Sequence, residues 1–100
     1  MPTFSTGVPH QLGTAQAAER LRKFIEQTQV QYQDLLSDLQ GQWLGNVLTF
    51  AFKAYGFKIN GTLTVDDTAA RLTGNLPLAA VPFRGKVEQV IQRELQRELA

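Results

Sequence analysis

The sequence predicts an α+β two-layer sandwich, in which two helices pack on one face of a curved antiparallel sheet. Between Leu48 and Val65, apolar and polar residues alternate with a period of two, as in strands that bury one face. Two other segments repeat apolar residues at spacings of three and four, as amphipathic helices do. The expected order is β-α-β-β-β-β-α, and stacking both helices on one side is the simplest way to bury the helical stripes and one sheet face.

The first strand and the first helix are expected near the N-terminus. Larger apolar residues alternate with smaller ones over Thr3–Val8 until Pro9 ends the run, which predicts a short strand. Gly13-Thr14 then offers a helix cap, and the apolar spacing predicts a helix from about Ala15 to Gln33. The apolar stripe of this helix consists of Ala17, Ala18, Leu21, Phe24, Ile25, Thr28 and Tyr32.

A four-stranded meander is expected in the middle of the chain. It comprises a strand over Leu36–Leu44, the two strands of the Leu48–Val65 ribbon and a last strand over Ala70–Leu76. The turn signals between these strands are Gly45-Asn46, Tyr55-Gly56 and Asp66-Asp67. Glycines at positions 41, 61 and 74 lie inside strands, where they allow a sharp bend or the approach of a helix. At the level of the fold alone, a curved sheet gripping a C-terminal helix is comparable to a reduced helix-grip architecture.

An apolar connector and a second helix complete the chain. The segment Leu76–Phe83 is apolar throughout, and its two prolines exclude a continuing central strand. Every fourth residue from Val87 to Leu99 is apolar, which predicts a helix from Val87 to the C-terminus. The residues expected to share one core are Phe50, Phe52, Ile59, Leu63 and Leu72 of the sheet and Leu21, Phe24, Ile25, Val87 and Ile91 of the helices.

The composition is that of an ordinary globular protein. With 100 residues, 43% of them hydrophobic and 19% charged, residues 1–100 are expected to form a single domain. A formal net charge of +1 gives no overall field that would attract nucleic acid or an anionic membrane. The sequence has no cysteine, which excludes disulfides and thiolate chemistry. It also shows no secretory signal pattern or membrane-spanning stretch, so a cytoplasmic location is expected.

Few residues are candidates for catalysis or metal binding. His10 is the only histidine, and because no partner for a general base can be identified, a turn histidine is the favoured interpretation. Asp66-Asp67 lacks the spacing of oxygen ligands that a calcium loop needs. Glu94 lies near the apolar ridge of the second helix, where a position at the rim is favoured over a buried one. No catalytic residue, metal or cofactor is therefore expected, and His10→Ala and Glu94→Gln should have small structural effects.

The polar face of the sheet is expected to carry three basic side chains, Lys53, Lys58 and Arg71, with no acidic residue among their neighbours on that face. Sheet surfaces that bind RNA usually add aromatic side chains on which bases stack, and none is predicted there. Nucleic-acid binding is therefore not expected. The favoured interpretation is a solvated surface or a polar contact in a homodimer.

The apolar connector is the best candidate for a binding surface. The candidate ligand or partner residues are Tyr55, Phe57, Leu76, Leu78, Val81 and Phe83. A buried connector would only set the chain direction before the second helix, whereas an exposed one would suit a hydrophobic ligand, another protein or a polymer surface. Phe83 would either close the core or stand at the mouth of an apolar cavity, and the second arrangement is favoured.

Several segments resemble a known family. They are Trp43–Leu63, which reads WLGNVLTFAFKAYGFKINGTL, then Gly74–Leu78, Pro82–Glu88 and the opening Pro9–Gly13. Together they are similar, over nearly the whole chain, to the putative polyhydroxyalkanoic acid system proteins. The resemblance implies a small bacterial protein linked by gene neighbourhood to polyhydroxyalkanoate storage granules. It implies no established activity and no catalytic residue to carry over.

The leading hypothesis is a non-enzymatic accessory protein of the polyhydroxyalkanoate system. It would bind an apolar ligand or the granule surface through the curved sheet and the connector. The alternative is a structural dimerisation or protein-interaction module, and a third class is an enzyme of acyl metabolism that uses His10 or Glu94. An apolar pocket would favour the first class, a filled core with an exposed apolar patch the second, and a convergent polar pair in a cleft the third.

Overall fold

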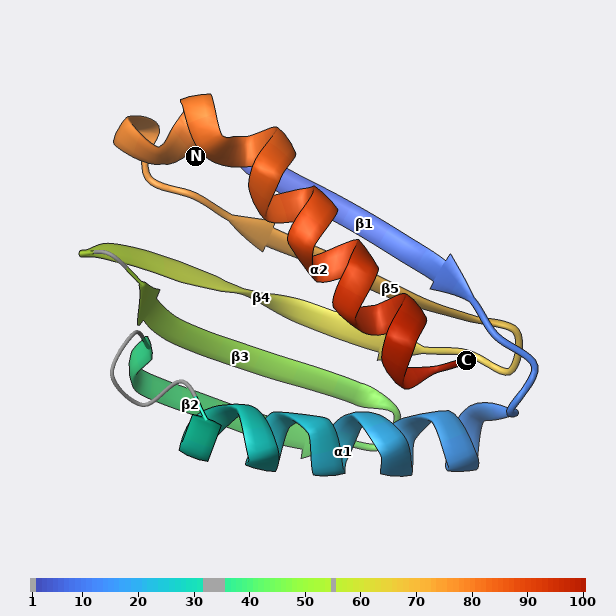
Figure 1. Ribbon diagram of the computed structural model, residues 1–100. Coiled ribbons are helices and arrows are strands. Elements are labelled where there is room, and N and C mark those ends of the chain that lie inside the picture. Colours follow the sequence, from blue (N-terminus) through green and yellow to red (C-terminus); the bar gives the residue numbers. More distant parts are fainter. Residues whose placement is uncertain (1, 32–35, 55) are drawn as a thin grey trace.

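The computed structural model describes residues 2–31, 36–54 and 56–100 (Figure 1). Its elements are β1 (Thr3–Pro9), α1 (Thr14–Gln31), β2 (Leu36–Leu44), β3 (Val47–Ala54), β4 (Phe57–Val65), β5 (Ala69–Asn75), the 3₁₀ turn η1 (Leu78–Phe83) and α2 (Arg84–Glu98). In this part of the chain the strands form one antiparallel sheet in the order β1-β5-β4-β3-β2. The fold is therefore α+β, with the predicted order β-α-β-β-β-β-α.

The two strands nearest the N-terminus occupy opposite edges of the sheet. Strands β2 to β5 follow one another as a meander, and β1 joins by pairing with β5, where Phe4 lies opposite Gly74. The chain therefore crosses from one edge to the other between β1 and α1, passing the ends of β4 and β5 (Figure 1). Contacts at this crossing hold the start of α1 in place, as described below.

The core lies between the sheet and the two helices. Leu48, Leu63 and Leu72 are direct partners across β3, β4 and β5, so their side chains share one face and all are buried. Both helices cover this face (Figure 1). The buried apolar residues are Phe4, Val8, Ala17, Ala18, Leu21, Leu48, Ile59, Leu63, Val65, Ala70, Leu72, Leu76, Ala80, Leu95 and Leu99.

The two helices diverge as they cross the sheet. Arg20 of α1 donates a hydrogen bond of 2.7 Å to the carbonyl oxygen of Ala100 just beyond α2, and from there the helices spread apart (Figure 1). Phe50 and Phe52 are consequently half-buried rather than buried, and Phe24 is half-buried outside the core cluster, which corrects the predicted core. Phe50 and Phe52 still pack against the core, as do the half-buried Ile25, Val87 and Ile91. Leu21, Ile59, Leu63 and Leu72 are buried as predicted.

Two strand glycines lie where a side chain would have no room. Gly61 and Gly74 are direct partners on β4 and β5. A Cβ atom at Gly74 would lie 2.5 Å from two ring carbons of Phe4, whereas one at Gly61 would first meet the main chain of β5 at the Thr73 oxygen and, at 2.7 Å, the Gly74 Cα. Gly74 therefore accommodates a ring from β1 and Gly61 the close approach of the β5 main chain, where the sequence predicted a bend or an approaching helix.

Side chains of α2 cover part of the outer edge of β1. The Ser5 amide donates a hydrogen bond of 2.8 Å to Glu88 Oε2, and Arg84 Nη1 donates one of 3.5 Å to the Thr3 carbonyl oxygen. Unpaired main-chain groups on an edge strand are a template for pairing with another chain. The side chains of Arg84 and Glu88 occupy two of these groups on β1.

The observed element bounds differ from the expected ones mainly at the helices. α2 begins at Arg84, three residues before the predicted start at Val87. The apolar periodicity did not reveal the first turn because residues 84–86 are exposed and not apolar. η1 forms within the apolar connector and was not predicted as a separate element. Within the described residues α1 extends to Gln31. The expected end of the first helix at Gln33 lies outside them.

Candidate functional site

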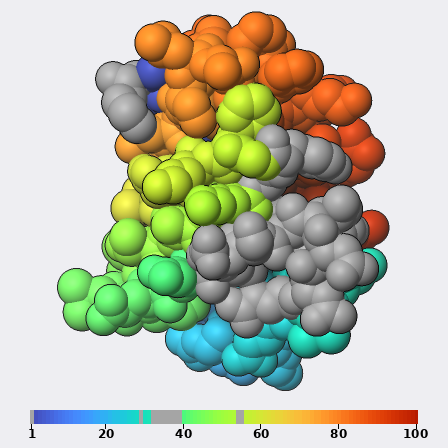
Figure 2. Space-filling view, turned by 90° about the vertical axis from the view of Figure 1, so that its left-hand side faces the viewer, coloured from blue at the N-terminus to red at the C-terminus, as the bar shows by residue number. Residues whose placement is uncertain are grey.

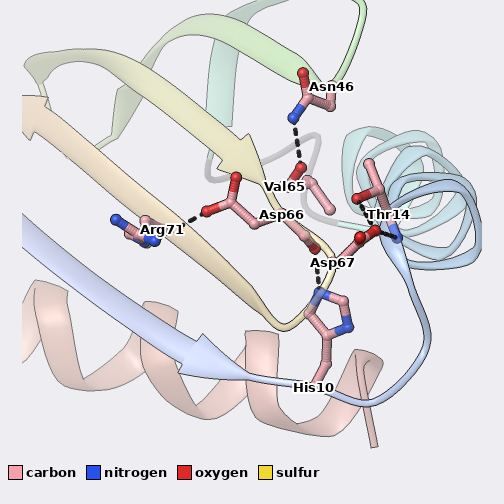
Figure 3. Close-up of polar contacts among 7 residues, drawn as sticks. All are labelled: His10, Thr14, Asn46, Val65, Asp66, Asp67 and Arg71. Atoms are coloured by element: carbon pink, nitrogen blue, oxygen red, sulfur yellow. Dashed lines mark hydrogen bonds and ion pairs between the residues drawn. The ribbon is translucent and has the colours of Figure 1, made fainter.

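His10 is held on both ring nitrogens by the main chain. It is only 6% exposed, and its Nδ1 accepts a hydrogen bond from the Leu12 amide at 3.2 Å. Its Nε2 lies 2.8 Å from the carbonyl oxygen of Asp66, to which it donates in the tautomer that satisfies both contacts (Figure 3). Because both ring nitrogens are hydrogen-bonded to the main chain, His10 has a structural role in the segment that crosses from β1 to α1, which agrees with the interpretation as a turn histidine.

The carboxylate of Asp67 caps the start of α1. Its Oδ1 accepts hydrogen bonds from Thr14 Oγ1 at 2.6 Å and from the Thr14 amide at 3.1 Å (Figure 3). These bonds, the side-chain one first, hold the pKa of Asp67 below its ordinary value of 3.8. The Asp66 carboxylate instead forms an ion pair with Arg71, in which Oδ2 lies 3.0 Å from Nη2. The two aspartates therefore have separate structural partners, and the described residues contain no cluster of three His, Asp or Glu that could hold a metal.

The turn between β2 and β3 is tied to the same end of the sheet. Asn46 Nδ2 donates a hydrogen bond of 2.6 Å to the carbonyl oxygen of Val65 (Figure 3). The Val65 amide in turn donates to the Asn46 carbonyl oxygen at 2.9 Å.

Glu94 of α2 is partly exposed and forms an ion pair with Arg97, one helical turn later. Its position is thus at the rim of the helix, as expected.

An exposed apolar surface lies at η1 and the first half of α2. We call Leu78, Phe83 and Val90 the apolar turn surface, because these side chains are 79%, 55% and 42% exposed. The orange atoms at the top of Figure 2 belong to η1 and the start of α2. Leu76 and Ala80, at 0% and 3% exposure, anchor the same segment in the core. The exposed Leu78 and Phe83 are therefore carried by a firmly packed turn, and Val90 lies on the helix that follows it.

The predicted surface residues do not all join this apolar turn surface. Leu76 is fully buried, so its proposed place on a binding surface is wrong: it follows β5 directly and continues the inward face of that strand. Val81 is half-buried, and Phe57 is half-buried against the core cluster. Tyr55 lies outside the described residues. Leu78 and Phe83 are the predicted candidates that the structure exposes.

The helix-free face of the sheet contains a shallow hollow of about 810 Å³ that crosses all five strands of the described sheet, which we call the polar trough. Its outward side chains are Thr3, Ser5, Gln40, Gln42, Thr49, Ala51, Asn60, Thr62, Thr73 and Asn75. Among these described lining residues none is ionisable. The sequence predicted a polar face, but the hollow depends on strand order and register, which alternation alone does not supply.

The basic residues of this face lie outside the trough. Lys58 is exposed and lies two residues before Asn60 on the same face of β4, outside the trough. The Arg71 side chain is 70% exposed and forms an ion pair with Asp66. The outward placement of Lys53, Lys58 and Arg71 follows from the register, since Lys53 pairs with Lys58 and Arg71 with Thr64. The trough itself is therefore neutral.

The fold and these surfaces define a small two-layer α+β protein with an exposed apolar turn on one side and a neutral polar trough on the other. No helix in the described part of the chain is long and apolar enough to cross a membrane. Residues 6–99 match the putative polyhydroxyalkanoic acid system proteins, and the chain belongs to this family. Neither a curated protein nor a solved structure matches the chain.

Proposed function

We propose that this protein is a non-enzymatic accessory protein of the polyhydroxyalkanoate system and that it binds the granule surface through the apolar turn surface. The observation that carries the proposal is the exposure of Leu78 and Phe83, at 79% and 55%, from a turn anchored by the buried Leu76 and Ala80. Membership of the polyhydroxyalkanoic acid system family supports the choice of the polymer as the apolar partner. Leu78 and Phe83 are the first and last residues of η1, and an exposed patch of apolar side chains marks an interaction surface.

The expected strength of this contact is modest. Fully burying a leucine or phenylalanine side chain contributes about 1.5–3 kcal/mol, so two such side chains contribute roughly 3–6 kcal/mol. A binding free energy of about 4 kcal/mol corresponds to a dissociation constant near 1 mM. A single copy would therefore bind weakly and reversibly, and many copies would be needed to coat a granule.

Co-sedimentation with purified, protein-free polyhydroxyalkanoate granules tests the proposal. Leu78→Ser and Phe83→Ser should each weaken binding about tenfold or more, because each removes apolar contact area. Phe83 occupies the N-cap position of α2, where serine is favoured, so Phe83→Ser should leave stability intact. Val30→Ser is the matched control, because Val30 is 72% exposed on α1, away from η1.

Two outcomes would contradict granule binding through this surface. Folded Leu78→Ser and Phe83→Ser variants could sediment like the wild type, or Val30→Ser could lose as much binding as they do. Binding only to granules that retain their native protein coat, and not to protein-free granules, would instead favour the protein-interaction module. Unchanged sedimentation of Val30→Ser together with loss in both turn variants is the expected result.

A further inference from the structure

The polar trough presents hydrogen-bonding side chains in two rows that run across the strands. The hydroxyl row consists of Ser5, Thr73, Thr62, Thr49 and Gln42, which are successive partners from β1 to β2. The amide row consists of Thr3, Asn75, Asn60, Ala51 and Gln40, also successive partners, and Ala51 is the member whose side chain forms no hydrogen bond. Neighbouring strands lie about 4.7–4.9 Å apart, so each row repeats with that spacing.

The side chains in these rows can donate hydrogen bonds to a ligand. Thr62 Oγ1 and Thr73 Oγ1 lie 3.3 Å apart, and because one hydroxyl donates to the other, the second keeps a hydrogen for a ligand. Asn75 Nδ2 donates to Asn60 Oδ1 at 3.0 Å, which leaves the amide hydrogens of Asn60 able to donate outward. The threonine methyl groups add apolar contacts beside these donors. A suitable ligand is uncharged, with regularly spaced acceptors and small alkyl groups.

The spacing of the rows fits one class of polymer. An extended peptide advances about 3.3–3.6 Å over the three backbone bonds of a residue, so an extended chain with four bonds per unit advances about 4.4–4.8 Å. A polyester of 3-hydroxy acids has four backbone bonds and one ester carbonyl per unit. Its carbonyl acceptors therefore repeat at nearly the distance between strands, and about five units would span the sheet.

Taking the class of polymer from the proposed function, we infer that the polar trough binds an extended, neutral run of 3-hydroxyalkanoate ester units laid across the strands. The free donors of the hydroxyl row, which include only one of the paired Thr62 and Thr73 hydroxyls, donate to ester carbonyls, and the alkyl groups of the polymer lie against the threonine methyls. The trough and the apolar turn surface have no residue in common, so the two sites can be tested separately. The volume of about 810 Å³ lies within the usual range of ligand sites.

Titration calorimetry of the full chain with a pentamer of 3-hydroxybutyrate, capped as an acetyl ester and a methyl ester, tests the site. Thr62→Val and Thr49→Val keep the side-chain shape and strand preference but remove a hydroxyl, and each should weaken binding about fivefold. Thr64→Val is the matched control, since Thr64 lies on the same strand and face but outside the trough. Binding should change little with salt, because neither partner is charged at the site.

Several results would overturn the inference. They are an absence of pentamer binding, an equal loss in Thr64→Val, and tighter binding of a neutral oligosaccharide of the same length. Leu78→Ser should bind the pentamer like the wild type, because Leu78 does not line the trough. Loss of granule sedimentation in Leu78→Ser with unchanged pentamer binding therefore separates the two proposals, and either can fail while the other stands.

Discussion

Replacing Gly74 by alanine should destabilise the fold strongly, because the new methyl group has no room. The Cβ atom would lie 2.5 Å from Cε1 and Cζ of Phe4 and 2.6 Å from the main-chain oxygen of Asn60. Carbon atoms in optimal contact lie about 3.5–4.0 Å apart, so the neighbours must retreat by about 1 Å. Phe4 is only 2% exposed and the Asn60 oxygen belongs to the backbone, so neither can move aside freely.

The expected cost is about 3 kcal/mol, the upper end of the usual range for overpacking a core. For a domain of this size, 1 kcal/mol shifts the melting temperature by about 4–8 °C, so Gly74→Ala should lower it by roughly 12–24 °C. Gly85→Ala is the control, because a Cβ there meets nothing within 4 Å. Since Gly85 lies in α2, the alanine should raise stability by up to about 1 kcal/mol.

Urea and thermal unfolding of both variants provide the measurement. A Gly74→Ala variant that melts within about 2 °C of the wild type would refute the argument, since the whole effect expected from overpacking is several times larger. A double-mutant cycle with Phe4→Ala adds a second check. Removing the ring opens space for the new methyl group, so the double variant should lose less stability than the sum of the single losses.

Three further changes test the contacts described above. Asp67 has a depressed pKa, so its contribution is present above the ordinary value of 3.8 and is lost as pH falls below that value through the lower folded pKa. Asp67→Asn should therefore flatten the loss of melting temperature in this acid range. His10→Ala should cost about 1–3 kcal/mol in urea unfolding, more than its position in a turn predicted, because His10 is buried with two hydrogen bonds. Phe50→Ala should cost less than Phe4→Ala, which should cost about 3–5 kcal/mol, because Phe50 is half-buried; equal losses in urea unfolding would contradict this ranking.

The sequence predicted the elements well because their signals are local. Alternation from Leu48 to Val65 marks the inward face of β3 and β4, and the spacing from Val87 to Leu99 marks the inward face of α2. The partial exposure of Phe50 could not be predicted in this way. It depends on the angle between two helices, which the periodicity of a single strand does not contain.

The candidate surface was predicted only in part, because its exposure also depends on how the chain is arranged beyond a single strand. Leu76 and Leu78 have the same side chain and lie two residues apart, yet the first is 0% and the second 79% exposed. Leu76 continues the inward alternation of β5, whereas Pro77 introduces the 3₁₀ turn and changes the periodicity. The polar trough likewise needs the pairing of β1 with β5, a contact between residues far apart in the sequence.

The partial cover of the β1 edge by α2 has a consequence for how the chain acquires its structure during synthesis. Ser5 and its partner Glu88 are separated by 83 positions, so the first strand emerges from the ribosome long before the helix that covers its edge. Until then the main-chain groups on that edge are open to pairing with other nascent chains. A chain that is clipped or stalled before residue 84 would lack this protection, and we expect it to aggregate even though every strand of the described sheet is already present.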